Sequence, residues 1–233
     1  MGTWSPFLHL WNCCDISTSL GVVMTITLEE LKRSPLYSEE LGITLGATSE
    51  EVEYFKWFLA SILFGGRISE TIARKTYSTF ERYHLLAPQL ILAAGLDFLI
   101  NPIMREGGYV RYDGRKSSQI LRNCEMLLQQ YGGSLTTLHE LAEDAQDLES
   151  RLLDFYGVGP VTVNIFLREL RPHWVKADPK PLPIVTALAV QIGLDLDALD
   201  RKTVAFARIE AGLIRQRKQL QEVVATRRQG ENV

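Results

Sequence analysis

Apolar residues recur at three- and four-residue steps along most of this 233-residue chain from residue 48 onward. This is the spacing of one face of an α-helix. The clearest early example comprises Val52, Phe55, Leu59, Ile62 and Leu63. Thr48 and Glu51 are placed as a capping box before it, and Gly65-Gly66 stops it.

The same spacing predicts further helices, each bounded by a residue type that starts or stops a helix. Ser69 and Pro88 mark starts, whereas Gly132 and Gly193 mark stops. The predicted helices cover residues 70–80, 89–94, 116–131, 148–156, 160–171, 184–192 and 203–225. The β-capable run 108–112 has no partner strand, so we expect an all-α fold without internal repeats.

The most informative segment is a predicted turn between two of these helices, Gly-Val-Gly-Pro at residues 157–160. Gly157 can adopt the left-handed conformation that ends a helix, and Pro160 suits the first position of the next one. Gly159 leaves the backbone open to an approaching ligand. The free N–H groups of the new helix then form a site for a phosphate oxygen. The alternative is a turn that only joins two packed helices.

The composition is typical of a globular protein, with 46% hydrophobic residues. The length suffices for one large domain or two small ones. Three cysteines without a C-x-x-C spacing argue against disulfides and cysteine-held metal, and favour a cytoplasmic location. No signal peptide or membrane span is evident. Because residues 1–23 differ from the rest, we expect Met24 to be the natural start; a native mass that includes residue 1 would contradict this.

Charge is unevenly divided along the chain, although the net charge is only −3. Residues 1–150 hold 12 basic and 19 acidic residues, whereas residues 151–233 hold 13 and 9. The basic part contains the predicted turn. Attraction of phosphate depends on a local face and not on total charge, so this asymmetry is compatible with nucleic-acid binding. Solvated helix surfaces alone could also produce it.

Four segments, taken in their order along the chain, together resemble those of a known protein family. They are the helix segment 55–64, the segment 112–133, the turn segment 155–167, and Ala177-Asp178 a little under twenty residues beyond the turn. Over roughly residues 50–215 the chain resembles the helix-hairpin-helix (HhH-GPD) DNA glycosylases, the superfamily that includes endonuclease III.

The resemblance implies two helical subdomains flanking a DNA-binding cleft. The hairpin would grip the DNA backbone through Gly157, Val158, Gly159, Pro160, Val161 and Thr162. The target base would be extruded into the cleft. Asp178 falls at the family's catalytic aspartate, whose carboxylate stabilises positive charge on the sugar as the glycosidic bond breaks. The alternative for Asp178 is a loop aspartate that fixes an Asp-Pro turn.

Departures from the family sharpen the expected chemistry. Bifunctional members carry a lysine where this chain has Val161, and valine cannot form a Schiff base. We therefore expect base removal without strand cleavage, unless Lys176 or Lys180 substitutes as the nucleophile; both otherwise contact phosphate or face solvent. The family's four-cysteine cluster is absent from the sequence. Arg67 is placed to fill the gap left by a flipped base, or only to contact phosphate or solvent.

The expected organisation is an extension at 1–23 followed by one glycosylase-like domain at 24–233. Within it lie a helical subdomain at about 50–135, the hairpin at 147–171 and C-terminal helices at 172–233. We expect a monomer that binds damaged or mismatched double-stranded DNA, without a cofactor or side-chain metal site. A monovalent cation at the hairpin carbonyls is a family property. The alternative functions are a non-catalytic DNA-binding protein and a bifunctional lyase. Tyr54, Trp57, Tyr109, Tyr112 and Trp174 are candidates for base stacking or for core.

Overall fold

The computed structural model describes residues 26–46 and 49–230, and over these residues the protein is all-helical with no β-strand. The elements are α1 (Leu28–Lys32), α2 (Tyr37–Glu40), α3 (Glu51–Phe64), α4 (Glu70–Arg82), α5 (Pro88–Phe98), a π-helical segment η1 (Leu99–Met104), α6 (Arg105–Gly107), α7 (Asp113–Tyr131), α8 (Leu135–Leu141), α9 (Ala145–Leu153), α10 (Pro160–Leu170), α11 (Pro183–Gln191) and α12 (Val204–Gly230).

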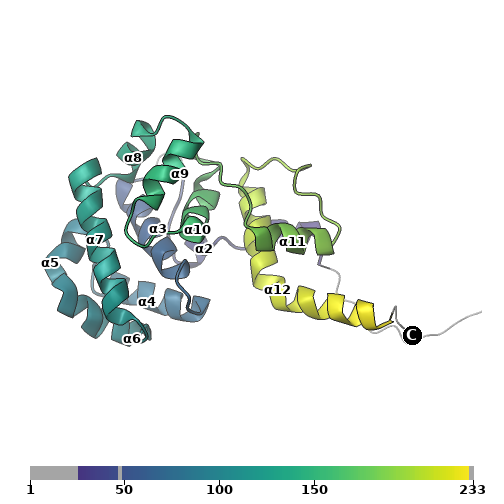
Figure 1. The fold of residues 1–233 in the computed structure, drawn as a ribbon, viewed down its shortest axis with the longest axis horizontal. Helices are drawn as coiled ribbons and strands as arrows, with labels where there is room; N and C mark the ends of the chain where they lie inside the picture. Colours follow the sequence, from purple (N-terminus) through teal and green to yellow (C-terminus); the bar gives the residue numbers. More distant parts are fainter. Residues whose placement is uncertain (1–25, 47–48, 231–233) are drawn as a thin grey trace, which may run out of the picture.

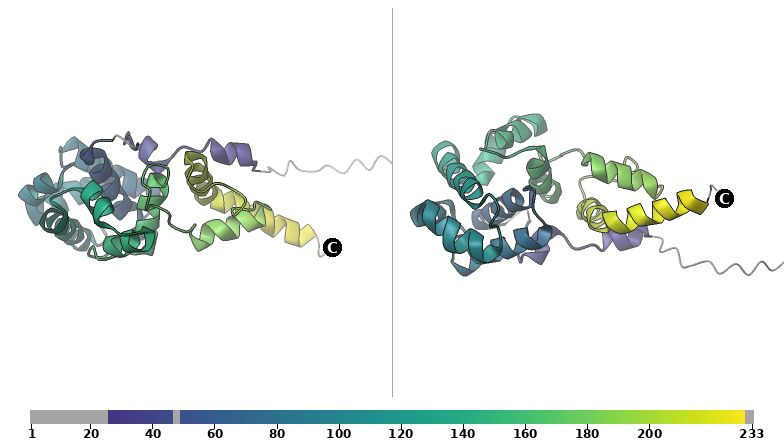
Figure 2. Two further views of the ribbon diagram at one scale, coloured as in Figure 1. Left: turned by 90° about the horizontal axis from the view of Figure 1, so that it is seen from above. Right: turned by 60° about the horizontal axis from the view of Figure 1, so that its bottom comes forward.

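These helices enclose two hydrophobic clusters. The larger is built mainly from α3 to α10, with Trp57, Phe155 and Phe166 among its fully buried side chains. The smaller is built from α1, α11 and α12, with Phe206 and Leu213 at its centre. Figure 1 shows the corresponding groups of helices side by side, and Figure 2 shows the chain crossing between them before α2 and after α10.

Most of the helix signals predicted from the sequence are confirmed. Ser69 caps α4 by accepting from the Ile72 amide, Pro88 begins α5, and Gly132 ends α7 in a left-handed conformation with φ of +63°. Gly193 likewise has a positive φ just beyond α11. Residues 108–112, which could have formed a strand, form none.

The predicted capping box before α3 is wrong in the role it gives to Glu51. Glu50 precedes the helix without a side-chain cap, while Thr48 lies outside the described residues, as does the predicted extension at 1–23. The Glu51 carboxylate instead accepts hydrogen bonds from the Ser134 hydroxyl and from the Leu135 and Thr136 amides. It therefore caps α8, because tertiary packing brings that helix N-terminus to the start of α3.

No helix in the described part of the chain is long and apolar enough to cross a membrane.

Candidate nucleic-acid interface

The turn between α9 and α10 has the backbone geometry that its glycines predicted. Gly157 has a φ of +68°, where an L-residue would be strained. Gly159 is the residue before α10, with φ of −117° and ψ of 175°, and Pro160 is the first helical residue. A Cβ added at Gly159 would meet nothing within 4 Å, so the turn is open to solvent on that side.

Five backbone amides at this turn have no hydrogen-bond acceptor among the described residues. They belong to Tyr156, Gly157, Gly159, Val161 and Thr162. The last two lie in the first turn of α10, where the helix dipole adds partial positive charge. Clustered unpaired amides of this kind favour a bound anion. Tyr156 flanks the turn. Its ring is exposed, and the Arg122 guanidinium lies 3.6 Å from the ring centroid.

Two of the predicted DNA-contacting residues have buried side chains. The Val158 amide donates to the Phe155 carbonyl at 3.0 Å, and the Val158 side chain is buried. Thr162 is also buried, because its hydroxyl packs against Gly65: a Cβ there would lie 2.0 Å from Thr162 Oγ1. Val158 and the Thr162 side chain therefore hold the hairpin in place, while the Thr162 amide remains free.

Val161 is 49% exposed and lines a pocket of about 720 Å³, which we call the Val161 pocket. Residues from α4, α10, α11 and α12 surround it, so it lies where the two groups of helices meet. Its walls include Val161, Ile165, Leu182, Ile214, Arg215 and Lys218. The pocket thus combines apolar walls with basic side chains close to the free amides of the turn.

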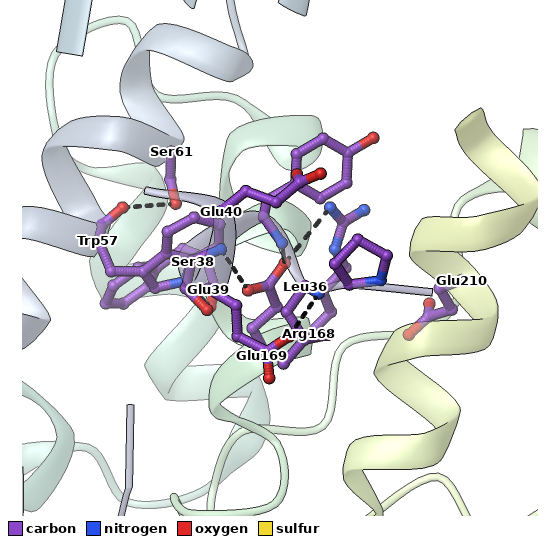
Figure 3. A network of polar contacts seen from close by, with 12 residues as sticks. Leu36, Ser38, Glu39, Glu40, Trp57, Ser61, Arg168, Glu169 and Glu210 are labelled. Atoms are coloured by element: carbon purple, nitrogen blue, oxygen red, sulfur yellow. Dashed lines mark hydrogen bonds and ion pairs between the residues drawn. The ribbon is translucent and has the colours of Figure 1, made fainter. Parts of the chain in front are cut away.

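A buried polar network fixes one side of this pocket (Figure 3). The Glu169 carboxylate accepts from the amides of Tyr37 and Ser38 at 3.1 and 3.0 Å, and it lies 3.8 Å from the Arg168 guanidinium. Burial raises the pKa of Glu169, against the opposing effect of Arg168 and these hydrogen bonds. The Tyr37 ring contacts the guanidinium groups of Arg168 and of Arg215 in α12, and the Arg215 group lies 4.1 Å from the ring centroid. The network joins α2, α10 and α12.

The structure places Asp178 in a second ion-pair network. Its carboxylate accepts from Arg201 and lies 3.6 Å from Arg171 Nε, and its side chain is one third exposed. Arg171 is fully buried and also pairs with Glu210 at 2.8 Å and donates to the Pro179 carbonyl at 2.7 Å. Asp178 does not line the Val161 pocket. In this arrangement its carboxylate connects the loop after α10 to the loop before α12, and Arg171 extends the network to α12 through Glu210.

The two lysines beside Asp178 differ from each other. The Lys176 ammonium donates to the carbonyls of His139, Glu140 and Ala142 at the end of α8, so its three protons are occupied. Lys180 is exposed, while its backbone carbonyl accepts from the Asn164 side chain at 2.8 Å.

Arg67 is exposed in the loop after α3, and it lines a second pocket, which shares Gly66 with the Val161 pocket. This pocket of about 580 Å³, which we call the Tyr112 pocket, lies between that loop, the start of α7 and the hairpin turn. Its side chains include Arg67, Tyr109, Tyr112, Arg115, Lys116 and Tyr156. Of the five aromatics predicted from sequence, Tyr54, Trp57, Tyr109 and Trp174 are buried, and only Tyr112 is exposed.

Sequence reasoning missed Arg115, Lys116 and Tyr156 as a group. Lys116 is largely buried and donates to the Ile62 carbonyl and to Gln119 Oε1, at 3.2 and 2.7 Å. Burial and the positive charge of Arg115 lower its pKa to about 8. The available signal was a lysine one helical turn after Tyr112 and three residues before Gln119, but the proximity of α7 to the turn is a tertiary feature.

Among the described residues, no group of three or more His, Cys, Asp or Glu side chains could hold a metal ion. Comparison with known proteins gives no assignment: no family model, no curated protein and no solved structure matches this chain.

Proposed function

We propose that this protein is a DNA glycosylase that hydrolyses the N-glycosidic bond of a damaged or mismatched base. The observation that carries the proposal is the hairpin turn, whose free amides at Gly157, Gly159, Val161 and Thr162 lie next to the basic Val161 pocket. The amides would hold a DNA phosphate without reading sequence. The resemblance to helix-hairpin-helix glycosylases supplies the reaction class.

In this proposal the extruded nucleotide binds in the Val161 pocket. Its volume of about 720 Å³ is in the range of ligand-binding clefts. Its apolar walls can contact a base, and the exposed Arg217 and Lys218 can contact the flanking phosphates, whereas Arg215 is paired with Glu40. In the resemblance this cleft separates two helical subdomains, and the two hydrophobic clusters support that division.

Asp178 would stabilise the oxocarbenium-like sugar and orient the attacking water. Since its carboxylate accepts from Arg201 and does not line the pocket, the proposal requires DNA binding to separate Asp178 from Arg201. Val161 cannot attack the sugar covalently, and the Lys176 ammonium is held by three carbonyls. These observations favour release of the base by water, which leaves an intact strand with an abasic site.

A non-catalytic DNA-binding protein is the second candidate. The specific observation in its favour is that the Asp178 carboxylate pairs with Arg201 and lies near Arg171. In this function the hairpin would bind DNA as proposed, while Asp178 would only fasten the loop after α10.

The experiment incubates the protein with duplexes that carry uracil, hypoxanthine, an oxidised purine, an alkylated base or a mismatch, and treats half of each sample with hot alkali. Nicks that appear only after alkali support the glycosylase, and Asp178→Asn should abolish them. Nicks without alkali would instead show lyase activity, and Lys180→Gln would test the exposed lysine. Duplex binding with no product from any lesion, unchanged in Asp178→Asn, would leave the second candidate.

A further inference from the structure

The Tyr112 pocket has the chemistry of an anion-binding site. Its lining residues include three cations, and none of its lining residues is Asp or Glu. Within the described residues, no carboxylate comes within 4.0 Å of Arg67, Arg115 or Lys116. Arg67 and Arg115 are exposed, but Lys116 is largely buried, and a buried charge is normally paired, so this arrangement favours a negatively charged ligand.

Lys116 provides the most specific evidence for this ligand. Its ammonium donates to the Ile62 carbonyl and Gln119 Oε1, which leaves its third proton without an acceptor among the described residues. The groups that face it in the pocket are Arg67, Arg115 and the tyrosine hydroxyls, and none supplies a negative charge near pH 7. Its lowered pKa is the consequence of burial without a counter-ion.

Aromatic side chains at the pocket mouth narrow the class of ligand. Tyr112 is 58% exposed and Tyr156 is 41% exposed, so both present a large aromatic ring to solvent. Tyr112 also has a φ of +67°, a conformation that is uncommon for a bulky residue. Exposed tyrosine rings beside arginines are suited to stacking on a nucleobase while the cations hold its phosphate.

We infer that the Tyr112 pocket binds one unstacked nucleotide of the strand whose neighbouring phosphate is held by the hairpin turn. Gly157 lines the pocket and also supplies a free amide to the turn, so one strand can contact both sites. This inference rests on the proposed binding of DNA by the hairpin. It adds a second nucleotide site, in a pocket that differs from the Val161 pocket in all its lining residues except Gly66.

The test compares two fluorescein-labelled duplexes of the same sequence, one fully paired and one with a single-nucleotide bulge, by fluorescence anisotropy. The bulge supplies an unstacked nucleotide without lesion chemistry. The wild type should bind the bulged duplex about tenfold more tightly. Tyr112→Asn, which suits a positive φ, and Lys116→Gln should both lose this preference while they keep their affinity for the paired duplex.

The controls separate the pocket from the hairpin. Lys75→Gln removes an exposed lysine of α4 and should keep the full preference. The preference should also weaken above about pH 8, because Lys116 then loses the proton that attracts phosphate. Equal affinity of the wild type for both duplexes, or a preference that survives in both pocket variants, would overturn the inference. Binding to neither duplex would overturn the proposed DNA binding as well.

Discussion

Lys116→Met is expected to stabilise the folded protein at pH 7, although it removes the central cation of the Tyr112 pocket. Burial and the charge of Arg115 lower the pKa of Lys116 from 10.5 to about 8, so the folded protein holds this proton less tightly than the unfolded chain. At about 1.4 kcal/mol per pKa unit, the charged form costs the folded state roughly 3 kcal/mol below pH 8.

Methionine has a similar length and carries no charge, so it removes this cost. Because the cost of the charge is already counted, the remaining comparison is with the neutral lysine amine, whose two hydrogen bonds to Ile62 and Gln119 contribute roughly 1 kcal/mol each and are lost in methionine. The net gain in the free energy of unfolding at pH 7 is therefore about 1 kcal/mol. If Lys116 serves ligand binding at a cost in stability, replacing it raises the free energy of unfolding. If it serves to stabilise the fold, replacing it lowers the free energy of unfolding.

The assay is urea unfolding of wild type and Lys116→Met between pH 6 and pH 10. The cost of the charged lysine is complete below about pH 8 and disappears as the pH rises toward 10.5, where the unfolded chain also loses the proton. The advantage of methionine should thus shrink with pH and reverse before about pH 10. Lys75→Met, at an exposed site, should differ from wild type by under about 0.5 kcal/mol throughout. A variant that is less stable at pH 7, or a difference that does not change with pH, refutes the reasoning.

Three further substitutions have definite expected outcomes. Gly65→Ala places a Cβ 2.0 Å from Thr162 Oγ1 and should lower the free energy of unfolding by roughly 1–3 kcal/mol in urea, and a neutral result would contradict the close packing of α3 and α10. Gly159→Ala meets nothing within 4 Å, so it should unfold like wild type but bind a duplex about tenfold more weakly, because a methyl group would extend into the open side of the turn that a phosphate must approach; unchanged affinity would argue against phosphate binding at the turn. Glu210→Ala leaves Arg171 buried with one partner fewer and should cost about 3–5 kcal/mol, and a loss under about 1 kcal/mol would show that Asp178 and the Pro179 carbonyl suffice.

The helices and the hairpin were predictable because their signals are local. A glycine with positive φ, a proline at the first helical position and a capping serine act over a few residues, as Gly157, Pro160 and Ser69 show. Glu51 shows the limit of such signals. Its position suits a local capping box, but the competing partner is the N-terminus of α8, more than eighty residues away, and only tertiary packing decides between them.

The ion-pair partners of Asp178 were beyond the reach of sequence. Arg201 lies 23 residues further along the chain, and Arg171 is fully buried although arginine seldom is. The resemblance to the glycosylases makes Asp178 a candidate for catalysis, but its position in the sequence carries no information about the direction of the carboxylate. The same holds for Lys176, whose partners on α8 lie more than thirty residues earlier.

Gln119 connects the two candidate phosphate-binding regions physically. A Cβ at Gly157 would lie 3.0 Å from its amide nitrogen, and its amide oxygen accepts from Lys116. The glycine is therefore required twice, by its positive φ and by the side chain beneath it. A phosphate held at the turn and a nucleotide in the Tyr112 pocket would consequently be positioned by one connected set of contacts. Because α7 fixes Gln119, the hairpin alone does not define this surface; the start of α7 is part of it.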